Sequence, residues 1–239
     1  MKVANLIIDI GNTALKAAWC DGMTLGRTFR YQGEKMMDFI LSLTSRTKPE
    51  IMVLSSKRFF SENNMKRLES ECDRLLVVNE DMLSQYGLPA YLTPDRAASI
   101  IAARYLFKGK GCMVFDFGTT LTIDMLDCEG GFEGGNISPG CRTRFKALNR
   151  YSRSLPLVDS PEEIEEKGTG ITSSIESGVI TGIIFELQGY ISRHPEKISV
   201  FTGGDAIYFA KRMKNSIFVV CNLVLMGLAL IAVEYDQKD

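Results

Sequence analysis

Residues 5–13 read N-L-I-I-D-I-G-N-T, and residues 111–120 read G-C-M-V-F-D-F-G-T-T. Each copy is an apolar, β-rich run that is followed by an Asp, one apolar residue, a Gly and a hydroxyl or amide residue. The two aspartates, Asp9 and Asp116, are separated by the same offset as the two glycines that follow them. A repeat at such a long period predicts a duplicated domain rather than a solenoid.

A second apolar alternation follows each copy, over residues 14–19 in the first and residues 121–126 in the second. This pattern predicts a strand, a tight glycine turn and a returning strand. Between and after the copies, helix and strand patterns alternate along the chain. We therefore expect two mixed α/β lobes, residues 1–109 and residues 110–239, each of which opens with the same hairpin.

The composition limits the class of protein. The chain has 239 residues, of which 45% are hydrophobic and 24% charged, so it is long enough to bury a core without disulfides. Its net charge of −1 argues against nucleic-acid binding, because there is no basic excess to neutralise phosphates. The six cysteines form no C-x-x-C pair, and His194 is the single histidine. We therefore expect a reduced, cytosolic chain without a zinc site.

The apolar stretch at residues 217–233 allows two interpretations. It is apolar except for Asn222, and its length falls at the lower edge of the roughly 20 residues that a membrane-spanning helix needs. The interpretation that we favour divides it into a buried strand over residues 217–220 and a helix over residues 223–235 that Asn222 caps. On that interpretation the protein has no membrane partner.

A strand that ends in Asp-x-Gly-Asn/Thr-Thr is suited to binding nucleotide phosphates. The glycine lets backbone N–H groups approach phosphate oxygens, and the hydroxyls of Thr13 and Thr119 add donors. The aspartate can hold a cation beside the phosphates, and Lys16 can reach the transferring phosphoryl group as a point charge. One copy alone is weak evidence, because an ordinary hairpin has the same pattern, but two copies predict two lobes that bind one nucleotide.

Two further turns have a recognisable pattern. Gly203 and Gly204 end a predicted strand before a helix, where a glycine pair can lie flat against an adenosine or form a plain turn. Thr93, Pro94 and Asp95 form a strong helix start, with Thr as N-cap and Pro at the first helical position. Because the helix dipole also favours an acidic residue there, this position alone does not distinguish a catalytic Asp95 from a structural one.

Together these motifs resemble the sugar kinase, Hsp70 and actin superfamily and, within it, the type III pantothenate kinase family. The resemblance covers nearly the whole chain. Residues 9–16 fit the first phosphate segment of that family, D-x-G-N-T-x-x-K, and residues 116–119 fit the second. Residues 135–140 fit its G-x-I-x-P-G segment. The C-terminal pattern is matched by residues 201–206 and 222–228.

The resemblance implies a fold and an activity. The implied fold is α/β, with duplicated ribonuclease H-like domains of the actin-like (ASKHA) type and mixed five-stranded sheets flanked by helices. The implied reaction is ATP-dependent phosphorylation of pantothenate to 4'-phosphopantothenate, the first step of coenzyme A biosynthesis. The resemblance also implies Mg²⁺ with ATP, a monovalent cation (K⁺ or NH₄⁺), and a cytoplasmic homodimer with pantothenate near the dimer interface.

The resemblance also implies the site residues. Asp95 would accept the proton of the pantothenate hydroxyl, and Asp116 would hold the monovalent cation. ATP would be bound by Asp9, Ile10, Gly11, Asn12, Thr13, Ala14, Leu15, Lys16, Thr119, Gly203 and Gly204. Pantothenate would be bound by Tyr86, Thr93, Pro94, Asp95, Arg96 and Thr172. Within that set, Arg96 would face the pantothenate carboxylate.

The sequence departs from the family pattern at two substrate positions. Thr93 occupies the place of the usual Gly in G-x-D-R, where it suits a helix cap but would crowd the substrate if that Gly provides close approach. Ile171 falls where the family has a substrate-binding Thr, although Thr169 and Thr172 lie nearby. Two alternatives therefore remain open: a non-catalytic relative that acts as a regulatory or binding protein, and a kinase for another small hydroxylated substrate.

Overall fold

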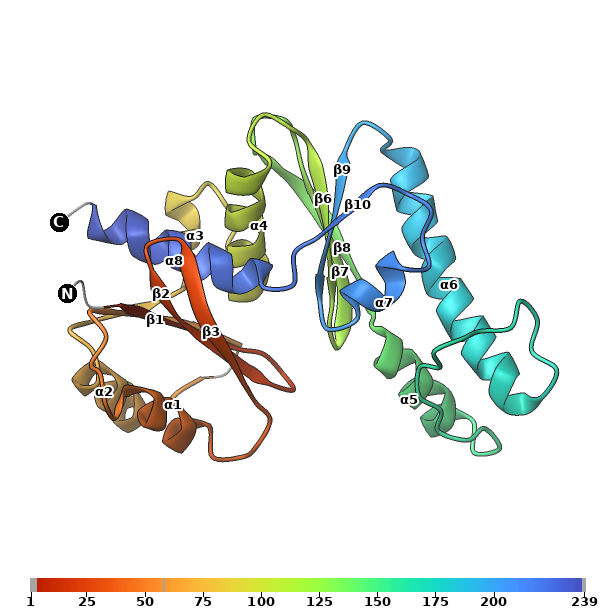
Figure 1. Ribbon diagram of the computed structural model, residues 1–239, viewed down its shortest axis with the longest axis horizontal. Coiled ribbons are helices and arrows are strands. Elements are labelled where there is room, and N and C mark those ends of the chain that lie inside the picture. Colours follow the sequence, from red (N-terminus) through yellow and green to blue (C-terminus); the bar gives the residue numbers. More distant parts are fainter. Residues whose placement is uncertain (1–3, 58, 238–239) are drawn as a thin grey trace. The chain divides into compact units, whose positions relative to one another are not determined.

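The two Asp-containing repeats form the central strands of two separate sheets (Figure 1). A computed structural model describes residues 4–57 and 59–237. They divide into a first unit, made of Met1–Leu106 with Asn222–Asp239, and a second unit, Phe107–Cys221. The boundary near residue 107 lies close to the predicted one, but the last segment belongs to the first unit rather than to the second.

The first sheet has the strand order β3-β2-β1-β4-β5. Strands β1, β2 and β3 are antiparallel neighbours, whereas β1, β4 and β5 run parallel. The glycine turn thus returns the chain as β2, and the two parallel strands follow after connections that contain helices. The strands are β1 (Asn5–Ile10), β2 (Leu15–Asp21), β3 (Thr24–Tyr31), β4 (Ile51–Ser56) and β5 (Arg74–Val77).

The second sheet repeats this plan with the order β10-β9-β6-β7-β8. Its central strand β6 again has an antiparallel neighbour on one side and a parallel neighbour on the other. The predicted duplication and the predicted mixed five-stranded sheets are therefore confirmed. The strands are β6 (Cys112–Phe117), β7 (Thr120–Leu126), β8 (Phe132–Pro139), β9 (Ile198–Gly203) and β10 (Ile217–Val219).

Helices cover both faces of the first sheet (Figure 1). α1 and α2 pack on the face that carries Leu6, Ile8 and Ile10, whereas α4 and α8 pack together against the other face. Ser61 caps α2 as its sequence predicts, since its Oγ accepts a hydrogen bond from Asn64 N at 3.3 Å. The helices are α1 (Met36–Thr44), α2 (Glu62–Ser70), α3 (Glu80–Gln85), α4 (Pro94–Leu106) and α8 (Leu223–Asp236).

Helix α3 occupies the start of a segment whose Gly87 and Pro89 are typical of a loop. The side chain of Asn79 accepts a hydrogen bond from Met82 N at 2.9 Å and caps this short helix, and Glu80 and Asp81 occupy its first turn. Asn and acidic residues in this order are a helix-start signal. The sequence therefore contains the signal that starts this helix.

The apolar stretch near the C-terminus divides as predicted into strand β10 and helix α8. Among the residues that the structure describes, no helix is both long and apolar enough to cross a membrane. The expectation of a buried strand is wrong, however, because Phe218 is 50% exposed and Val219 38% exposed. β10 is an edge strand that pairs only with β9 within its sheet. Ile217 packs against the core of the second unit, whereas Phe218 has only a partial cover, which includes the ring of Phe107 at a centroid distance of 5.2 Å.

All three helices of the second unit pack on one face of its sheet. Phe115 and Phe117 of β6 face this layer, and Phe117 stacks on Phe209 of the short helix that follows β9, with ring centroids 5.2 Å apart. The large apolar side chains of the long α6 complete this core. The helices are α5 (Cys141–Tyr151), α6 (Ile171–Arg193) and α7 (Ala206–Ala210).

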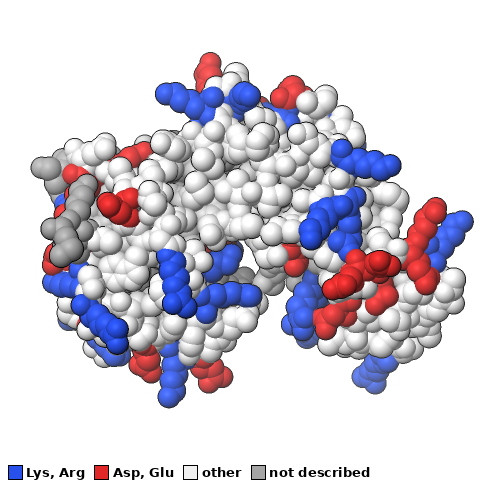
Figure 2. Space-filling model, viewed as in Figure 1, with Lys and Arg blue, Asp and Glu red and all other residues white. Residues whose placement is uncertain are grey.

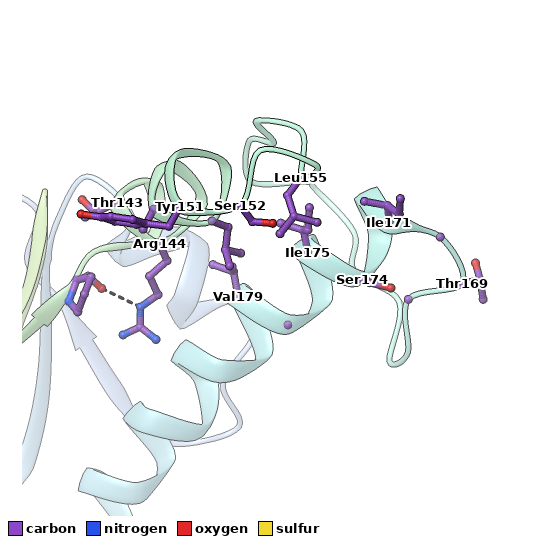
Figure 3. Close-up of a pocket in the computed structure, with 16 residues that line it drawn as sticks. Thr143, Arg144, Tyr151, Ser152, Leu155, Thr169, Ile171, Ser174, Ile175 and Val179 are labelled. Carbon is purple, nitrogen blue, oxygen red and sulfur yellow. Dashed lines mark hydrogen bonds between the residues drawn. The ribbon is translucent and has the colours of Figure 1, made fainter.

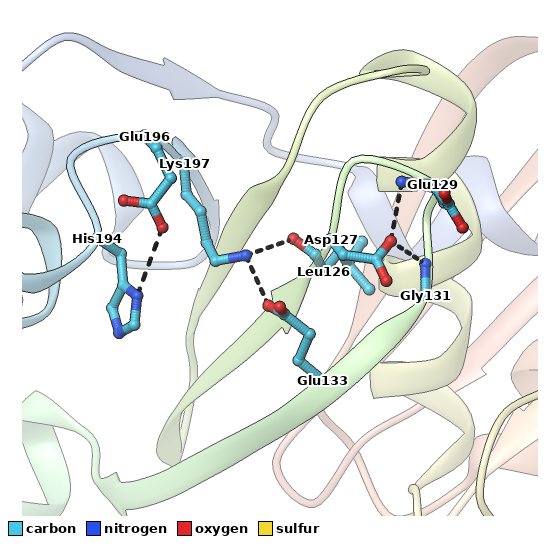
Figure 4. Close-up of polar contacts among 8 residues, drawn as sticks. All are labelled: Leu126, Asp127, Glu129, Gly131, Glu133, His194, Glu196 and Lys197. Atoms are coloured by element: carbon cyan, nitrogen blue, oxygen red, sulfur yellow. Dashed lines mark hydrogen bonds and ion pairs between the residues drawn. The ribbon is translucent and has the colours of Figure 1, made fainter.

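A buried lysine joins the β7–β8 hairpin to the start of β9 (Figure 4). The Lys197 side chain is 8% exposed, and its Nζ donates to Leu126 O at 2.9 Å and to Glu133 Oε2 at 2.6 Å. In the adjoining turn, Asp127 Oδ1 accepts hydrogen bonds from the backbone N–H groups of Glu129 and Gly131. A buried ammonium needs such partners, so this cluster fixes one end of the second sheet.

Charged side chains of both signs are interspersed on the face seen in Figure 2, and no broad basic surface forms there. This distribution agrees with the net charge of −1. A continuous basic surface is the electrostatic feature on which nucleic-acid binding depends. The visible face therefore offers no such feature.

The α4–α8 contact requires a glycine. A Cβ added to Gly227 would lie 1.9 Å from Ala98 O, whereas a Cβ on Gly189 of α6 would meet no atom within 4 Å. We expect Gly227→Ala to lower the free energy of unfolding by about 1–3 kcal/mol, because two helix backbones must separate. Gly189→Ala should instead be neutral or raise it by up to about 1 kcal/mol, because alanine favours the helix.

Thermal and urea unfolding of both variants measure these differences. A Gly227→Ala protein as stable as the unsubstituted chain would contradict the close approach of α4 and α8.

Candidate active site

The first phosphate hairpin places three polar residues side by side across the first sheet. Asp9 lies opposite Lys16 in the antiparallel β1–β2 pair and opposite Ser55 in the parallel β1–β4 pair. Asp9 is 9% exposed, and Ser55 Oγ donates a hydrogen bond to its Oδ1 at 2.9 Å. Because residues that lie opposite in a sheet share a face, the Lys16 side chain leaves the sheet on the same side as the Asp9 carboxylate.

The turn between β1 and β2 is closed by a hydrogen bond from Gly11 N to Ala14 O at 3.0 Å. This bond leaves Asn12 and Thr13 exposed at the tip. Ile10 and Leu15, by contrast, are 0% exposed and belong to the core of the first unit. Of the predicted ATP-binding segment, these two residues can therefore offer only backbone atoms.

The second Asp-x-Gly hairpin, between β6 and β7, is hydrogen-bonded to the start of α5. Gly118 N donates to Thr120 O at 3.0 Å, and Thr119 O accepts hydrogen bonds from Gly140 N at 3.0 Å and from Thr143 Oγ1 at 2.6 Å. A Cβ on Gly140 would lie 2.1 Å from Gly118 O, so only glycine fits there. The Thr119 residue remains exposed. The sequence analysis matched Gly140 to a motif but gave neither it nor Thr143 a role.

The glycine pair after β9 lies directly beside Asp116. Strand β9 runs parallel to β6, with Thr202 opposite Asp116, and Gly204 N donates to Phe117 O at 2.8 Å. Gly203 has φ +92°, and a Cβ there would lie 2.5 Å from Asp116 Oδ1. Both its conformation and its surroundings therefore require glycine. The parallel pairing of β6 and β9 therefore brings the Gly203–Gly204 turn next to Asp116 within the second unit.

The donor atoms around Asp116 suit a hard cation. Its Oδ1 atom and the carbonyl oxygen of Phe117 each lie 2.5 Å from the position that a Cβ on Gly203 would take, and oxygen atoms are the ligands that K⁺ and Mg²⁺ prefer. Among the described residues, no group of three or more His, Cys, Asp or Glu side chains is arranged to hold a metal ion. Asp116, the predicted metal residue, therefore offers a single carboxylate, and a cation there would need further ligands.

Asp95 lies in the first turn of α4, with Pro94 as the first residue of that helix. Its carboxylate receives a hydrogen bond from Thr93 Oγ1 to Oδ1 at 2.5 Å and forms an ion pair between Lys57 Nζ and Oδ2 at 2.8 Å. The side chain of Asp95 is 18% exposed and that of Lys57 26%. Lys57 is distant from Asp95 in the sequence and follows β4 without any motif, so no sequence pattern indicates this contact.

Tyr86 directly follows α3 and is hydrogen-bonded to the C-terminal helix α8 of the same unit. Its hydroxyl donates to Glu234 Oε2 at 2.7 Å, and its carbonyl accepts from Arg104 Nη1 at 2.7 Å. Burial, together with the Glu234 carboxylate, raises the pKa of Tyr86 above its ordinary value. The phenol therefore stays protonated and offers its oxygen as an acceptor. Arg96, the other predicted substrate residue here, is only 6% exposed.

A cavity of about 1120 Å³ opens in the second unit between α5, the loop that follows it and the start of α6 (Figure 3). Tyr151 and Leu155 line one side, and Thr169 and Ile171 lie at the start of α6. Thr172, the predicted substrate residue, is exposed in the first turn of α6 and is not among the lining residues. Of the two hydroxyl residues considered next to Ile171, it is Thr169 that borders the cavity.

These features define an actin-like fold in which duplicated sheets each carry an Asp-x-Gly hairpin. The same fold occurs in a putative N-acetylmannosamine kinase from Listeria monocytogenes, with a TM-score of 0.54, 13% identity and coverage of 99% of this chain and 100% of that one. It also occurs in a conserved putative Baf family transcriptional activator from Campylobacter jejuni. That structure has a TM-score of 0.68, 21% identity and coverage of 97% of this chain and 99% of that chain.

Comparisons of the sequence with known proteins show the family to which the chain belongs. The model of the type III pantothenate kinase family matches residues 5–193. A type III pantothenate kinase from Phocaeicola vulgatus is 36% identical over 98% of this chain and 99% of its own length. One from Cytophaga hutchinsonii is 36% identical over 94% of this chain and 96% of its own length. The chain therefore belongs to the type III pantothenate kinase family, as its motifs predict.

The Gly203–Gly204 turn provides a matched pair of substitutions. Gly203→Ala introduces a Cβ at positive φ and against the Asp116 carboxylate, whereas the nearest atom to a Cβ on Gly204 is Phe117 O at 3.8 Å. We expect Gly203→Ala to lower the free energy of unfolding by about 1–3 kcal/mol and to weaken nucleotide binding, because Asp116 is displaced. Gly204→Ala should change the stability by less than about 0.5 kcal/mol.

Thermal unfolding and calorimetric titration with a non-hydrolysable ATP analogue measure the two effects. Unchanged nucleotide affinity in Gly203→Ala would contradict the assignment of this turn to the nucleotide site.

Proposed function

We propose that this chain transfers the γ-phosphoryl group of ATP to the hydroxyl of pantothenate and forms 4'-phosphopantothenate, the first step of coenzyme A biosynthesis. The observation that carries the proposal is the retention of both Asp-x-Gly hairpins at equivalent strand ends of the duplicated sheets. Membership of the type III pantothenate kinase family supports pantothenate as the acceptor. Family membership thus supports pantothenate as the acceptor, and the geometry of the two hairpins supports the binding of ATP phosphates.

We assign ATP to the two hairpins and the glycine turn. The exposed residues Asn12, Thr13 and Thr119 present donors at the turn tips. Lys16 leaves the first sheet beside Asp9, where its ammonium neutralises charge that develops on the phosphoryl oxygens. Gly203 and Gly204 provide backbone that an adenosine can approach without a Cβ in the way.

Asp95 is the proposed proton acceptor. The pantothenate hydroxyl oxygen forms a bond to the γ-phosphorus of ATP while the bond from that phosphorus to the bridging oxygen of ADP breaks. The bridging oxygen keeps the electron pair, and the hydroxyl proton passes to the Asp95 carboxylate. Because phosphoryl transfer is mostly positioning and charge stabilisation, a carboxylate can orient the hydroxyl and accept its proton late.

Asp116 is the proposed residue for a monovalent cation, K⁺ or NH₄⁺, and Mg²⁺ accompanies ATP. The oxygen atoms beside Gly203 fit such ions. When bound, the cations neutralise phosphate charge. The chain itself provides the Asp116 carboxylate and keeps it in place through the absence of a side chain at Gly203.

The proposed pantothenate contacts are Tyr86, Thr93, Pro94, Asp95, Arg96 and Thr172. The Tyr86 hydroxyl, which donates to Glu234, can still accept a hydrogen bond from the substrate. Arg96 can pair with the substrate carboxylate. Thr172 does not line the cavity, but it is exposed and directly follows Ile171, which does.

We also propose a cytoplasmic homodimer. Large apolar side chains on α5 and α6 are exposed, among them Tyr151 at 84%, Ile171 at 62% and Phe185 at 66%. Exposed apolar patches on a soluble chain often mark an interface. Light scattering coupled to size-exclusion chromatography measures the mass, and a monomer at micromolar concentration would contradict this assembly.

The decisive assay is ADP production from MgATP, with and without pantothenate, in potassium and in sodium buffer. We expect turnover that depends on pantothenate and is stimulated by potassium. Turnover that is indifferent to pantothenate would leave a kinase for another hydroxylated substrate. A folded protein that binds ATP without turnover in either buffer would favour the non-catalytic relative.

Asp95→Asn tests the proton acceptor. We expect kcat to fall by about 10²–10⁴-fold, the range in which general-base groups contribute, while the affinity for an ATP analogue stays within about twofold. The matched control is Asp73→Asn, since Asp73 also forms a 2.8 Å ion pair with a lysine in the same unit but is 60% exposed. Near-normal kcat in Asp95→Asn would exclude Asp95 as the acceptor.

A further inference from the structure

Both carboxylate oxygens of Asp95 are engaged by neighbouring side chains. The Thr93 hydroxyl donates to Oδ1 at 2.5 Å, and the Lys57 ammonium lies 2.8 Å from Oδ2. We propose that Thr93 and Lys57 are positioning residues that hold the Asp95 carboxylate in the orientation from which it accepts the substrate proton. This inference rests on the proposed function, because it assigns a purpose to the surroundings of the proposed acceptor.

Two donors on different oxygens restrict rotation of the carboxylate about its Cβ–Cγ bond. Hydrogen bonds to an ionised acceptor are among the stronger ones in proteins, and here neither partner is fully exposed to competing water. A carboxylate has about four lone-pair sites, so each oxygen keeps one for the substrate hydroxyl. The carboxylate is thus fixed without being blocked.

The two donors are themselves anchored by secondary structure. Thr93 precedes α4, and its carbonyl accepts a hydrogen bond from Ala97 N at 3.0 Å as the helix begins. Lys57 follows β4 directly, and its backbone N–H donates to Ile10 O at 3.4 Å. Neither donor sits in a free loop, so their geometry is set by the fold of the first unit.

The end of β4 connects the acceptor to the first phosphate hairpin. Ser55, two residues before Lys57, donates to the buried Asp9 carboxylate at 2.9 Å, and Lys57 reaches Asp95 from the same strand end. One strand end therefore fixes both a phosphate-site carboxylate and the proposed proton acceptor. Small misplacements of a reacting group can cost about a hundredfold in rate, which makes such an anchor mechanistically useful.

Thr93 could act in a different way, by crowding the substrate, and this account makes the opposite prediction for Thr93→Gly. The family pattern usually has Gly at this place, and a Thr there would crowd the substrate if close approach were needed. On that account Thr93→Gly would improve substrate binding and lower KM for pantothenate. On the positioning account, Thr93→Gly loses a hydrogen bond to Asp95 and lowers kcat instead.

The first unit contains a matched pair of control contacts. Thr44 Oγ1 donates to Glu71 Oε2 at 2.5 Å, the same kind of bond at the same length as Thr93 to Asp95. Lys48 Nζ lies 2.8 Å from Asp73 Oδ1, matching Lys57 and Asp95. Neither control pair includes a residue of the proposed site.

The experiment compares steady-state kcat and KM for ATP and pantothenate in Thr93→Val, Thr93→Gly, Thr93→Ser, Lys57→Met and Lys57→Arg. We expect kcat to fall about tenfold to a hundredfold in Thr93→Val, Thr93→Gly and Lys57→Met, with each KM within about twofold. Thr93→Ser and Lys57→Arg keep the donor and should retain most of kcat. The controls Thr44→Val and Lys48→Met should leave kcat unchanged.

Thermal unfolding confirms that each variant is folded before its rate is interpreted. Wild-type kcat in Thr93→Val and Lys57→Met would overturn the proposal, and so would an equal loss in Thr44→Val and Lys48→Met. A lower KM in Thr93→Gly without loss of kcat would assign Thr93 to crowding instead. If the unsubstituted protein does not phosphorylate pantothenate, the proposed function fails and this inference fails with it, whereas active protein with insensitive variants overturns this inference alone.

Discussion

The parallel pairing of a central strand with the strand that follows the first connection organises both units. In the first sheet it sets Asp9 opposite Ser55, and in the second it sets Asp116 opposite Thr202. Because parallel strands present their carboxyl ends at one edge, the turns that follow them meet there. The Ser55 bond to the buried Asp9 carboxylate and the glycine turn beside Asp116 are both consequences of this pairing.

The second constraint is close backbone approach around the second hairpin. Gly140 lies against the carbonyl of Gly118, and Gly203 lies against Asp116 and the backbone of Phe117. A side chain at either place would push the hairpin or the carboxylate out of position. Thr143 adds a hydrogen bond to Thr119 O. The turn between β6 and β7, which is proposed to bind ATP, is therefore held in place by contacts with residues distant in the sequence.

The two units have the same sheet architecture, but the residues proposed for the reaction differ between them. The first unit carries the proposed proton acceptor, with Lys57 and Thr93 around Asp95. The second carries the proposed cation residue, Asp116, and the glycine turn that is proposed to bind adenosine. The last helix, α8, belongs to the first unit, where Glu234 binds the Tyr86 hydroxyl. The two units therefore share the plan of their sheets but differ in their helices and loops.

Local patterns in the sequence determined the duplicated hairpins, the helix start at Thr93–Asp95 and the division of the apolar C-terminal stretch, because each depends on neighbouring residues. The sequence also carried the family resemblance. Only the tertiary structure decided the partners of Asp95 and Tyr86, the role of Gly140 and the exposure of β10. Those features arise from contacts between segments that are distant along the chain, and hydrophobic periodicity contains no information about which distant side chain will fill a given place.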